Sequence, residues 1–348
     1  MVARRKTRTR QPRQPVITTY DIAKRAGVNQ STVSRALSRP DKIRPDTIER
    51  VMRACEELGY VPNIAARTLK TGQSFALAVY IPFGTETVFA DPFVPVFLGG
   101  VNEEASQAGY STLLFYPGSA KTKVDLVQLV KSRRADGVIL TSPSEPDPRL
   151  EALAKAKVPC VTGRYPTKRG SSVICVDVDN RHTGALAARF LLSRGHRRIG
   201  LLLEPPRSRV GVDFQAGFCE TMAEAGVKQS SRLVKHIPIT FEAAREAARQ
   251  LLAAKTPPSA LVAATALAVF PLVEAVRQAG LDVLPLGVDS PLFRFLRPDL
   301  PRIKVPTREL GRRMTAALIH AVQNSGAKEP VEMLRAELLD ENGLPFTD

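Results

Sequence analysis

A run of small hydroxyl side chains with one guanidinium group lies near the start of the chain. Ser31, Ser34, Arg35 and Ser38 fall on one side of a predicted helix over 31–37, because residues three or four apart share a helix face. Hydroxyl and guanidinium groups bind phosphate oxygens and the edges of bases. Such small side chains also allow a close approach to a duplex, so this face has the chemistry of a DNA-contacting surface.

A short helix and a glycine turn precede this face. Thr18 and Asp21 have the spacing of a capping box, which predicts a helix over 20–26 that ends at Gly27. Asn29 can cap the next helix, over 31–37. The inward-facing residues expected on this second helix are Val33, Ala36 and Leu37. Two short helices around a glycine turn are typical of the helix-turn-helix, whose second helix enters the major groove.

A third helix follows the two short ones. Pro45 lies in its first turn, Asp46 and Glu49 lie near the positive end of its dipole, and Gly59 ends it. Its apolar residues recur at helical spacing and predict a buried face made of Ile48, Val51, Cys55 and Leu58. The three helices together predict a compact all-α head.

Positive charge is concentrated in this head. Residues 1–72 contain 16 Lys and Arg against 6 Asp and Glu, so +10 of the net +16 lies there. A basic module on a nearly balanced body indicates a polyanion partner, although a solvated basic surface would give the same count. Residues 1–15 hold six positive charges and no acid, which predicts a disordered arm. That arm would either contact phosphates or act as a solubilising tail.

Residues 17–72 closely resemble the DNA-binding head of the lactose-repressor (LacI/GalR) family of bacterial transcription regulators. The resemblance is carried by DIAKRAGV, STVSR, ELGYVPN and the AAR-x-L that follows. It implies that Gln30, Ser31 and Arg35 read base edges, with Arg35 suited to a guanine and Gln30 to an adenine. It also implies phosphate contacts that set the register. The implied phosphate-contacting residues are Thr18, Tyr20, Thr32, Ser34, Ser38 and Asn63.

The same resemblance implies a hinge helix over about 63–70, which completes a DNA-binding domain over 16–71. Seven residues are too few to sustain a helix alone, so we expect the hinge to form on DNA. Paired hinges from two protomers would place Ala66 and Leu69 in the minor groove. The alternative for Leu69 is a linker residue packed on the body.

The remaining residues, 72–348, alternate apolar runs with amphipathic stretches. This alternation predicts parallel sheets built from βαβ units, in two doubly wound lobes with a ligand cleft between them. The expected strands are 76–81, 112–115, 137–140, 158–162, 199–203, 260–263 and a last one at 337–339. The expected helices are 96–108, 123–133, 182–194, 242–254 and 267–279.

A weaker family resemblance continues through this body. It is carried by DPF (91–93), RADGVIL (134–140), VDVDN (176–180), GHRRIGLL (195–202), GVD (287–289) and PTRELGRR (306–313). It implies the two-lobed, periplasmic-binding-protein-like fold and a homodimer built mostly on first-lobe helices. The implied lobes are 73–177 with 303–326, and 178–302 with 327–348. The chain would cross between them near Asp179, within 290–302 and within 325–331.

The implied effector pocket departs from the family pattern. Phe214 stands where relatives often carry an Arg, Ala264-Thr265 replaces an Asn-Asp, and Arg164 stands where some relatives offer an Asp. The effector-binding residues expected by position are Phe93, Arg164, Phe214, Thr265 and Asp289. These replacements favour an unusual sugar derivative, such as an anionic one, or an effector that is not a sugar. The alternative is that Arg164 only forms an ion pair with Asp289 or Asp177.

Several function classes lack their sequence signals. No apolar run reaches the roughly 18 residues that span a bilayer, and the arginine-rich start lacks the apolar segment of a signal peptide. Phosphate-loop, dinucleotide-binding and HExxH motifs are missing from the sequence, and its four histidines are isolated. We therefore expect no cofactor, no metal and no enzyme activity. The separated cysteines, which are Cys55, Cys160, Cys175 and Cys219, favour reduced thiols in the cytoplasm.

Together these features predict a cytoplasmic, nucleoid-associated transcriptional regulator, most simply a repressor of a carbohydrate operon. Two protomers would bind a palindromic double-stranded operator, and a small effector in the cleft would control them. No leucine heptad follows the strand at 337–339, which favours a dimer over a tetramer. The other hypotheses are a transport solute-binding protein and a cytosolic sugar-modifying enzyme, and neither explains the basic head.

Overall fold

The computed structural model describes residues 17–38, 42–60, 68, 72–117, 124–141, 146–163, 173–324 and 331–347. The chain divides into two compact units, Met1–Thr71 and Gly72–Asp348. Outside the described part lie the arm 1–15, three predicted hinge residues and one predicted effector residue, namely Asn63, Ala66, Leu69 and Arg164. The side chain of Ser38 is also outside it. No helix within the described ranges has the length and apolarity to cross a bilayer.

The first unit contains α1 (Thr19–Ala26), α2 (Gln30–Ser38) and α3 (Pro45–Glu57). The three predicted helices are confirmed, with ends that differ by one or two residues. Gly27 ends α1 with φ +65°, a left-handed conformation that side chains other than glycine rarely adopt. The helices share one small core, in which Ile22, Val33 and Val51 are fully buried. Packing therefore fixes the orientation of α2 and leaves its hydroxyl-bearing side outward.

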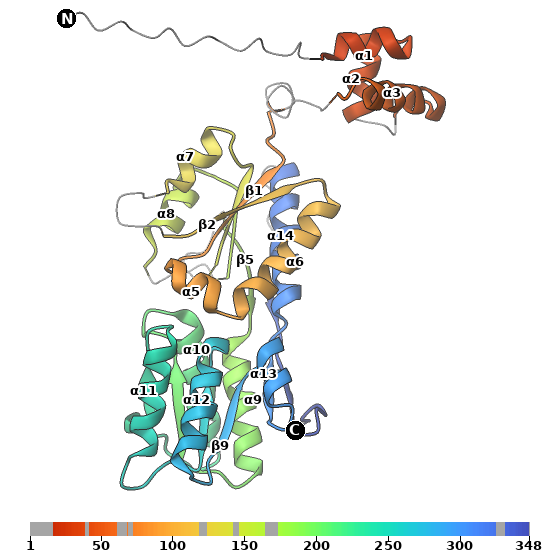
Figure 1. The fold of residues 1–348 in the computed structure, drawn as a ribbon. Helices are drawn as coiled ribbons and strands as arrows, with labels where there is room; N and C mark the ends of the chain where they lie inside the picture. Colours follow the sequence, from red (N-terminus) through yellow and green to blue (C-terminus); the bar gives the residue numbers. More distant parts are fainter. Residues whose placement is uncertain are drawn as a thin grey trace, which may run out of the picture. The chain divides into compact units, whose positions relative to one another are not determined.

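The second unit contains two six-stranded sheets (Figure 1). We call the part around the first sheet the first lobe and the part around the other sheet the second lobe. The first sheet, in spatial order, is β11 (Glu332–Leu334), β5 (Ile174–Val178), β4 (Cys160–Thr162), β3 (Gly137–Leu140), β1 (Ala76–Tyr80) and β2 (Ser111–Phe115). The second is β12 (Glu337–Leu339), β10 (Arg302–Lys304), β9 (Leu284–Val288), β8 (Ala260–Ala263), β6 (Ile199–Leu203) and β7 (Val234–His236). All neighbours are parallel except β10 and β12, as doubly wound lobes require.

Helices cover the faces of both sheets. The first lobe has α5 (Thr85–Ala90), α6 (Phe93–Gln107), α7 (Leu126–Lys131), α8 (Pro148–Lys155) and α14 (Thr307–Gln323). The second has α9 (Asn180–Ser193), α10 (Arg209–Glu224), α11 (Phe241–Leu252), α12 (Ala266–Ala279) and α13 (Pro291–Leu296). In Figure 1, α6 runs beside α14 in the first lobe, and the two helices are in direct contact. Apolar cores lie between the sheets and these helices.

The structure corrects the expected lobe boundaries. Strand β10 belongs to the second sheet because Ile303 pairs with Val288, so residues 303–304 are not in the first lobe. Strand β11 belongs to the first sheet because Glu332 pairs with Val176. The chain crosses between lobes after β5, between β10 and α14, and between β11 and β12. The crossings predicted within 290–302 and 325–331 are therefore wrong, and only that near Asp179 agrees.

A carboxylate fixes the start of the first lobe. Asp136, just before β3, accepts hydrogen bonds from the backbone amides of Ser74 (2.7 Å) and Phe75 (2.8 Å). The Ser74 hydroxyl also donates to it, at 2.9 Å. Phe75 has a φ of +53°, which holds the chain in a sharp bend immediately before β1. Asp136 therefore satisfies the two backbone donors that this bend leaves outside the strand ladder.

Candidate DNA-contacting face and ligand cavity

The exposed side of α2 carries the polar groups predicted from the sequence. Gln30, Ser31 and Arg35 are exposed, and Thr32 and Ser34 are partly buried beside them. The backbone amides of Thr32 and Val33 donate to the carbonyl of Asn29, so the helix begins there. The expected inward positions are confirmed, because Val33 and Ala36 are buried and Leu37 packs on the same core. The face thus combines donors, acceptors and a cation on one rigid helix.

Local contacts hold several of these side chains in place. The amide of Gln30 donates to the hydroxyl of Thr19 at 2.9 Å, which links the start of α2 to α1. The backbone amide and the hydroxyl of Thr18 both donate to Asp21, at 2.8 and 2.7 Å. These bonds form the predicted capping box and keep the pKa of Asp21 below its usual value. Tyr20, which is 68% exposed, lies beside them.

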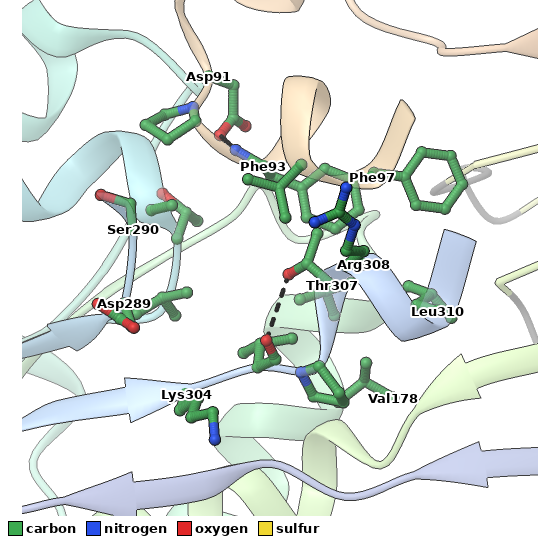
Figure 2. A pocket seen from close by; sticks show the side chains of 18 of the residues that line it. Asp91, Phe93, Phe97, Val178, Asp289, Ser290, Lys304, Thr307, Arg308 and Leu310 are labelled. Carbon is green, nitrogen blue, oxygen red and sulfur yellow. Dashed lines mark hydrogen bonds between the residues drawn. The ribbon is translucent and has the colours of Figure 1, made fainter. Parts of the chain in front are cut away.

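A cavity of about 820 Å³ lies between the two lobes of the second unit. Its wall comes from the carboxyl ends of strands and from the starts of helices, as in other open α/β sheets. First-lobe residues include Asp91, Phe93 and Asp177, and second-lobe residues include Glu204 and Asp289. In Figure 2, Asp91 and Phe93 lie above the centre, Asp289 and Ser290 lie at the left, Lys304 lies below, and Thr307 and Arg308 at the start of α14 lie near the centre. The volume is that of a small-molecule site.

Three carboxylates of this wall are held by hydrogen bonds from neutral groups. Asp91, directly after α5, accepts the backbone amide of Phe93 at 3.0 Å. Asp177, near the end of β5, accepts the backbone amide of Val178 at 2.7 Å. Glu204, directly after β6, accepts the hydroxyl of Ser208. We call Asp91, Asp177 and Glu204 the acidic group. None of its members forms an ion pair with a cation in the described part of the chain.

Burial raises the pKa of each member of the acidic group. The pKa of Asp91 rises to about 6, mainly because the side chain is buried. The pKa of Glu204 rises to about 7, through burial and then the charge of Asp91. The pKa of Asp177 rises to about 8, through burial and then the charges of Asp213 and Glu204. Like charges held together away from water disfavour ionisation. The raised pKa values therefore agree with the absence of a compensating cation beside these carboxylates among the described residues.

A fourth carboxylate in the cavity does have cationic neighbours. The Asp289 Oδ2 atom lies 3.2 Å from Arg294, and its Oδ1 lies 3.9 Å from Arg302 Nε. That second distance is too long for a hydrogen bond. Among the described residues, both Asp289 Oδ1 and Arg302 Nε are buried without a hydrogen-bond partner. A ligand group placed between them could satisfy an acceptor and a donor at once.

The other cations of the wall are paired with carboxylates. Lys304 pairs with Glu337 at 3.0 Å, and Arg308 pairs with Glu103 at 3.2 Å. Arg209 pairs with Asp213 at 2.6 Å. Arg312 lies between Glu104 and Glu309, at 3.5 and 3.2 Å. The described lining holds six carboxylates and six cations, and the acidic group differs from the other carboxylates because its members have no cationic partner among the described residues.

The structure brings together most of the predicted effector residues, but not Phe214. Phe93, Thr265 and Asp289 line the cavity. Thr265 also caps α12, because its hydroxyl accepts the backbone amide of Ala268 at 3.3 Å. Phe214 is only 2% exposed, and it stacks on Phe218 within the core of the second lobe. Its assignment to the effector site is therefore wrong: an apolar ring at this helix position packs into the core.

The predicted set did not include several cavity residues, although the sequence holds a signal for them. Asp177 ends the apolar run of β5, Glu204 follows the run of β6 directly, and Ser290 follows Asp289 after β9. A polar residue at the carboxyl end of a buried parallel strand is a candidate for the ligand edge of the sheet. Arg302 carries no such signal, because it precedes the apolar residue of a very short strand.

The described geometry defines a class of protein: a helix-turn-helix unit joined to a two-lobed ligand-binding unit. Residues 18–63 match the family of bacterial regulatory proteins called the lacI family, and residues 87–334 match the periplasmic binding proteins and sugar-binding domain of the LacI family. The chain belongs to the LacI family and is a DNA-binding transcriptional regulator.

The similarity to known regulators extends over nearly the whole chain. The regulator CelR of Thermobifida fusca is 32% identical over 319 residues, which are 90% of this chain and 94% of CelR. AglR of Rhizobium meliloti is 29% identical over 91% of each chain. The solved complex of CelR with cellobiose has a TM-score of 0.71 at 30% identity, and covers 94% of this chain and 99% of that one. An operator-bound lac repressor dimer matches in fold, with a TM-score of 0.76 at 22% identity over 94% of this chain and 99% of that one.

Proposed function

We propose that the protein is a repressor that binds an inverted-repeat operator as a homodimer and responds to a sugar-like effector in the cavity. The observation that carries the proposal is the joint presence of a donor-rich α2 face in the first unit and an interlobe cavity in the second. The target genes would be those of carbohydrate use, and the site of action would be the chromosome in the cytoplasm. The cavity would bind its ligand without transforming it.

Specific reading of DNA would come from the exposed face of α2. Arg35 would donate two hydrogen bonds to a guanine, and Gln30 would exchange hydrogen bonds with an adenine. Ser31 would contact a base edge at the start of the helix. The phosphate contacts would come from Thr18, Tyr20, Thr32, Ser34, Ser38 and Asn63. Outside the described residues, Ala66 and Leu69 would enter the minor groove.

A polyhydroxyl effector fits the unpaired atoms near Asp289. A hydroxyl group could donate to Asp289 Oδ1 and accept from Arg302 Nε, the two buried atoms that lack partners in the described structure. Phe93 would offer an apolar surface to the ring of a sugar. The bound cellobiose of the CelR complex supports this class of ligand. Arg164, which lies outside the described residues, would sit near this ligand.

Selection of inverted-repeat DNA tests the proposal. Purified protein is mixed with a random inverted-repeat library at moderate salt, and the enriched sequence is compared with a scrambled competitor in a gel-shift titration. We expect at least a 10³-fold preference for the enriched repeat, as specific protein–DNA complexes show. Sugars are then added, and at least one should change the operator affinity; linkage requires operator DNA to change the affinity of that sugar by the same factor. Equal binding of repeat and competitor under every ligand would refute the proposal.

A further inference from the structure

The charges of the cavity wall are unequally compensated. Each cation described above lies beside a carboxylate, whereas the acidic group, Asp91, Asp177 and Glu204, has hydrogen bonds only from neutral groups among the described residues. Its members also repel one another: the charge of Asp91 raises the pKa of Glu204, and the charge of Glu204 raises the pKa of Asp177. Removing several like charges from water is unfavourable unless an opposite charge enters the site.

We propose that the effector is an amino sugar whose positively charged amine binds between Asp91, Asp177 and Glu204. The proposal depends on the cavity being the effector site and names the chemical class of its ligand. An ammonium group has three donors and no acceptor, which matches three carboxylates in their ionised form, because ionised carboxylates offer only acceptors. Binding of the amine would therefore displace the protons that Asp177 and Glu204 hold at pH 7. In this arrangement the ligand supplies the missing charge, and each of its N–H groups finds an oxygen.

Aromatic rings beside the acidic group suit the same ligand. Phe83 and Phe93 line the cavity with Asp91 and Glu204, and Phe93 is stacked on Phe97 with ring centroids 5.4 Å apart. The face of an aromatic ring attracts a cation, and it also packs on the apolar face of a sugar ring. Carboxylates and aromatic faces together thus favour a cationic group with a carbon skeleton over a bare anion.

A separate observation places the remainder of the ligand. The Asp289 side chain is only 8% exposed and lines the same cavity, and its Oδ1 atom lacks a hydrogen-bond partner within the described structure. Arg302 Nε, at 3.9 Å, is a buried donor that also lacks one. A hydroxyl group fits between them, as proposed above. The cavity therefore offers one place for a hydroxyl and another for an amine, which is the pattern of an amino sugar.

The alternatives fit the wall less well. The acidic group would repel an anionic ligand. The ligand charge expected from the acidic group is therefore opposite to the charge expected from Arg164 alone. A neutral sugar would leave the raised pKa values of Asp177 and Glu204 unchanged, whereas a cation would stabilise their ionised forms. Within the described ranges, no three His, Cys, Asp or Glu residues are arranged to hold a metal ion. Among the described residues no cation pairs with the acidic group, and an organic cation is the ligand that would compensate it.

Calorimetric titration of the full-length protein at pH 7 tests the proposal. The amine probes are D-glucosamine, D-galactosamine, D-mannosamine and the β-1,4-linked disaccharide of glucosamine. The neutral probes are the N-acetylated forms of these sugars together with glucose, galactose, mannose and cellobiose. We expect at least one amine to bind tenfold or more tightly than its neutral counterparts. Thermal-shift assays with a dye provide a second readout, since the protein has no Trp.

Variants assign the amine to its site. Glu204→Gln and Asp177→Asn should each reduce the affinity of the preferred amine at least tenfold, while the affinity of its neutral counterpart changes less. The matched control is Glu242→Gln, an exposed glutamate of the second lobe that is not in the cavity wall and should keep the amine preference. Both cavity variants remove a partly buried carboxylate whose raised pKa opposes its ionised form, so they should unfold at a temperature no lower than the parent, and lost binding would not reflect unfolding.

Each result bears on the proposal in one direction. Absence of binding by every amine, equal affinity for amines and neutral sugars, or an amine preference that survives both cavity variants would overturn it. Cellobiose or another neutral sugar that binds tightly and changes operator affinity would overturn the amine assignment alone and leave the proposed function intact. Absence of any preference for inverted-repeat DNA would instead contradict the proposed function.

Discussion

Gly100 of α6 lies directly against the backbone carbonyl of Arg308 in α14. A methyl group added at Gly100 would lie 2.0 Å from that oxygen, and a methyl group added at Gly311 of α14 would lie 2.4 Å from the carbonyl oxygen of Phe97. The two helices therefore pack backbone to backbone, with a glycine on each side. Because α14 begins at the cavity wall, this contact sets the position of Thr307 and Arg308 there.

Substitution of Gly100 by Ala should separate α6 from α14. We expect Gly100→Ala to lower the free energy of unfolding by about 1–3 kcal/mol, because rigid backbone atoms must move to admit the methyl group. Gly99→Ala is the matched control, since the nearest atom to an added methyl group there is the end of the Arg308 side chain at 3.9 Å. The control should be neutral or up to about 1 kcal/mol stabilising, because alanine favours helix. Denaturant unfolding of both variants measures the difference, and equal stability would contradict the packing.

Replacement of Arg35 by Ala should reduce sequence discrimination more than overall DNA affinity. A bidentate contact with one base contributes about 1–3 kcal/mol of discrimination, so the preference for operator over scrambled DNA should fall by roughly 5- to 150-fold. Gel-shift titrations at several salt concentrations measure this ratio. The control is Arg53→Ala, an exposed arginine on α3 that should leave the ratio unchanged. An unchanged ratio in the Arg35 variant would show that α2 does not read the base through this side chain.

The ligand-free protein should lose stability as the pH rises from about 4 to 8. Asp91, Asp177 and Glu204 have pKa values of about 6, 8 and 7 when folded, all above their ordinary values of 3.8, 3.8 and 4.5. The folded chain thus binds these protons more tightly than the unfolded chain, so the contribution of the acidic group to stability is greatest below the ordinary values. It then decreases as pH rises through the folded values. Asp213 faces the same group, and His236 Nδ1 contacts the Glu204 carbonyl at 2.8 Å.

A neutral amide at position 204 should reduce this pH dependence. At pH 8, Glu204→Gln should be more stable than the parent by at least about 1.4 kcal/mol, the free energy of one pKa unit. Urea unfolding at pH 5, 6, 7 and 8 measures the change, and Glu242→Gln serves as the exposed control. A parent whose stability increases over this range, with no effect of Glu204→Gln, would show that the side chain is not a buried carboxylate.

Removal of the Asp136 carboxylate should destabilise the start of the first lobe. Asp136→Ala leaves the backbone amides of Ser74 and Phe75 without their acceptor, and each lost bond costs about 1–3 kcal/mol where water cannot replace it. Hydrogen exchange should show faster exchange at residues 74–75 and along β1. The control Asp282→Ala removes an exposed aspartate of the second lobe, so protection of β1 in that variant should remain at the parent level.

Local patterns were sufficient to predict the helices of the head and most of the buried strands of the body. Residues 199–203 form an apolar run of strand length, and Gly27 and Pro45 mark helix ends by their own backbone preferences. The buried strands β5 and β9 were not predicted: Asp177 interrupts the apolar run of β5, and Pro285 and Gly287 interrupt that of β9. Strands β7, β10 and β11 were not predicted because each has three residues, with exposed or charged side chains among them. Pairing with neighbours far along the chain makes them strands, and no short window of sequence contains those neighbours.

The positions of Asp177 and Glu204 at strand ends mark each residue singly, but the proximity of the acidic group's members could not be predicted because it is formed by tertiary contacts. Asp91, Asp177 and Glu204 come from separate parts of the sequence, and they approach one another only where the two lobes face. The raised pKa values depend on burial and mutual repulsion, which a residue type does not reveal. Phe214 shows a different limit of sequence-based prediction. The resemblance predicted its place on the helix, but a resemblance does not reveal that an apolar side chain at this place packs into the core.

The three chain crossings also restrict how the two lobes can move. Strands β5 and β11 are neighbours in one sheet, β10 and β12 are neighbours in the other, and the connecting segments contain only one or two residues. Sliding of one lobe along the other would stretch these short connections, whereas bending about them would not. At the far edge of the second sheet, just beyond β7, the carbonyl of Ile239 accepts the Thr87 hydroxyl at 3.2 Å. Bending about the three connections would therefore open or close the cavity on the side of the Thr87–Ile239 contact. The size of the bound ligand would set how far that side opens.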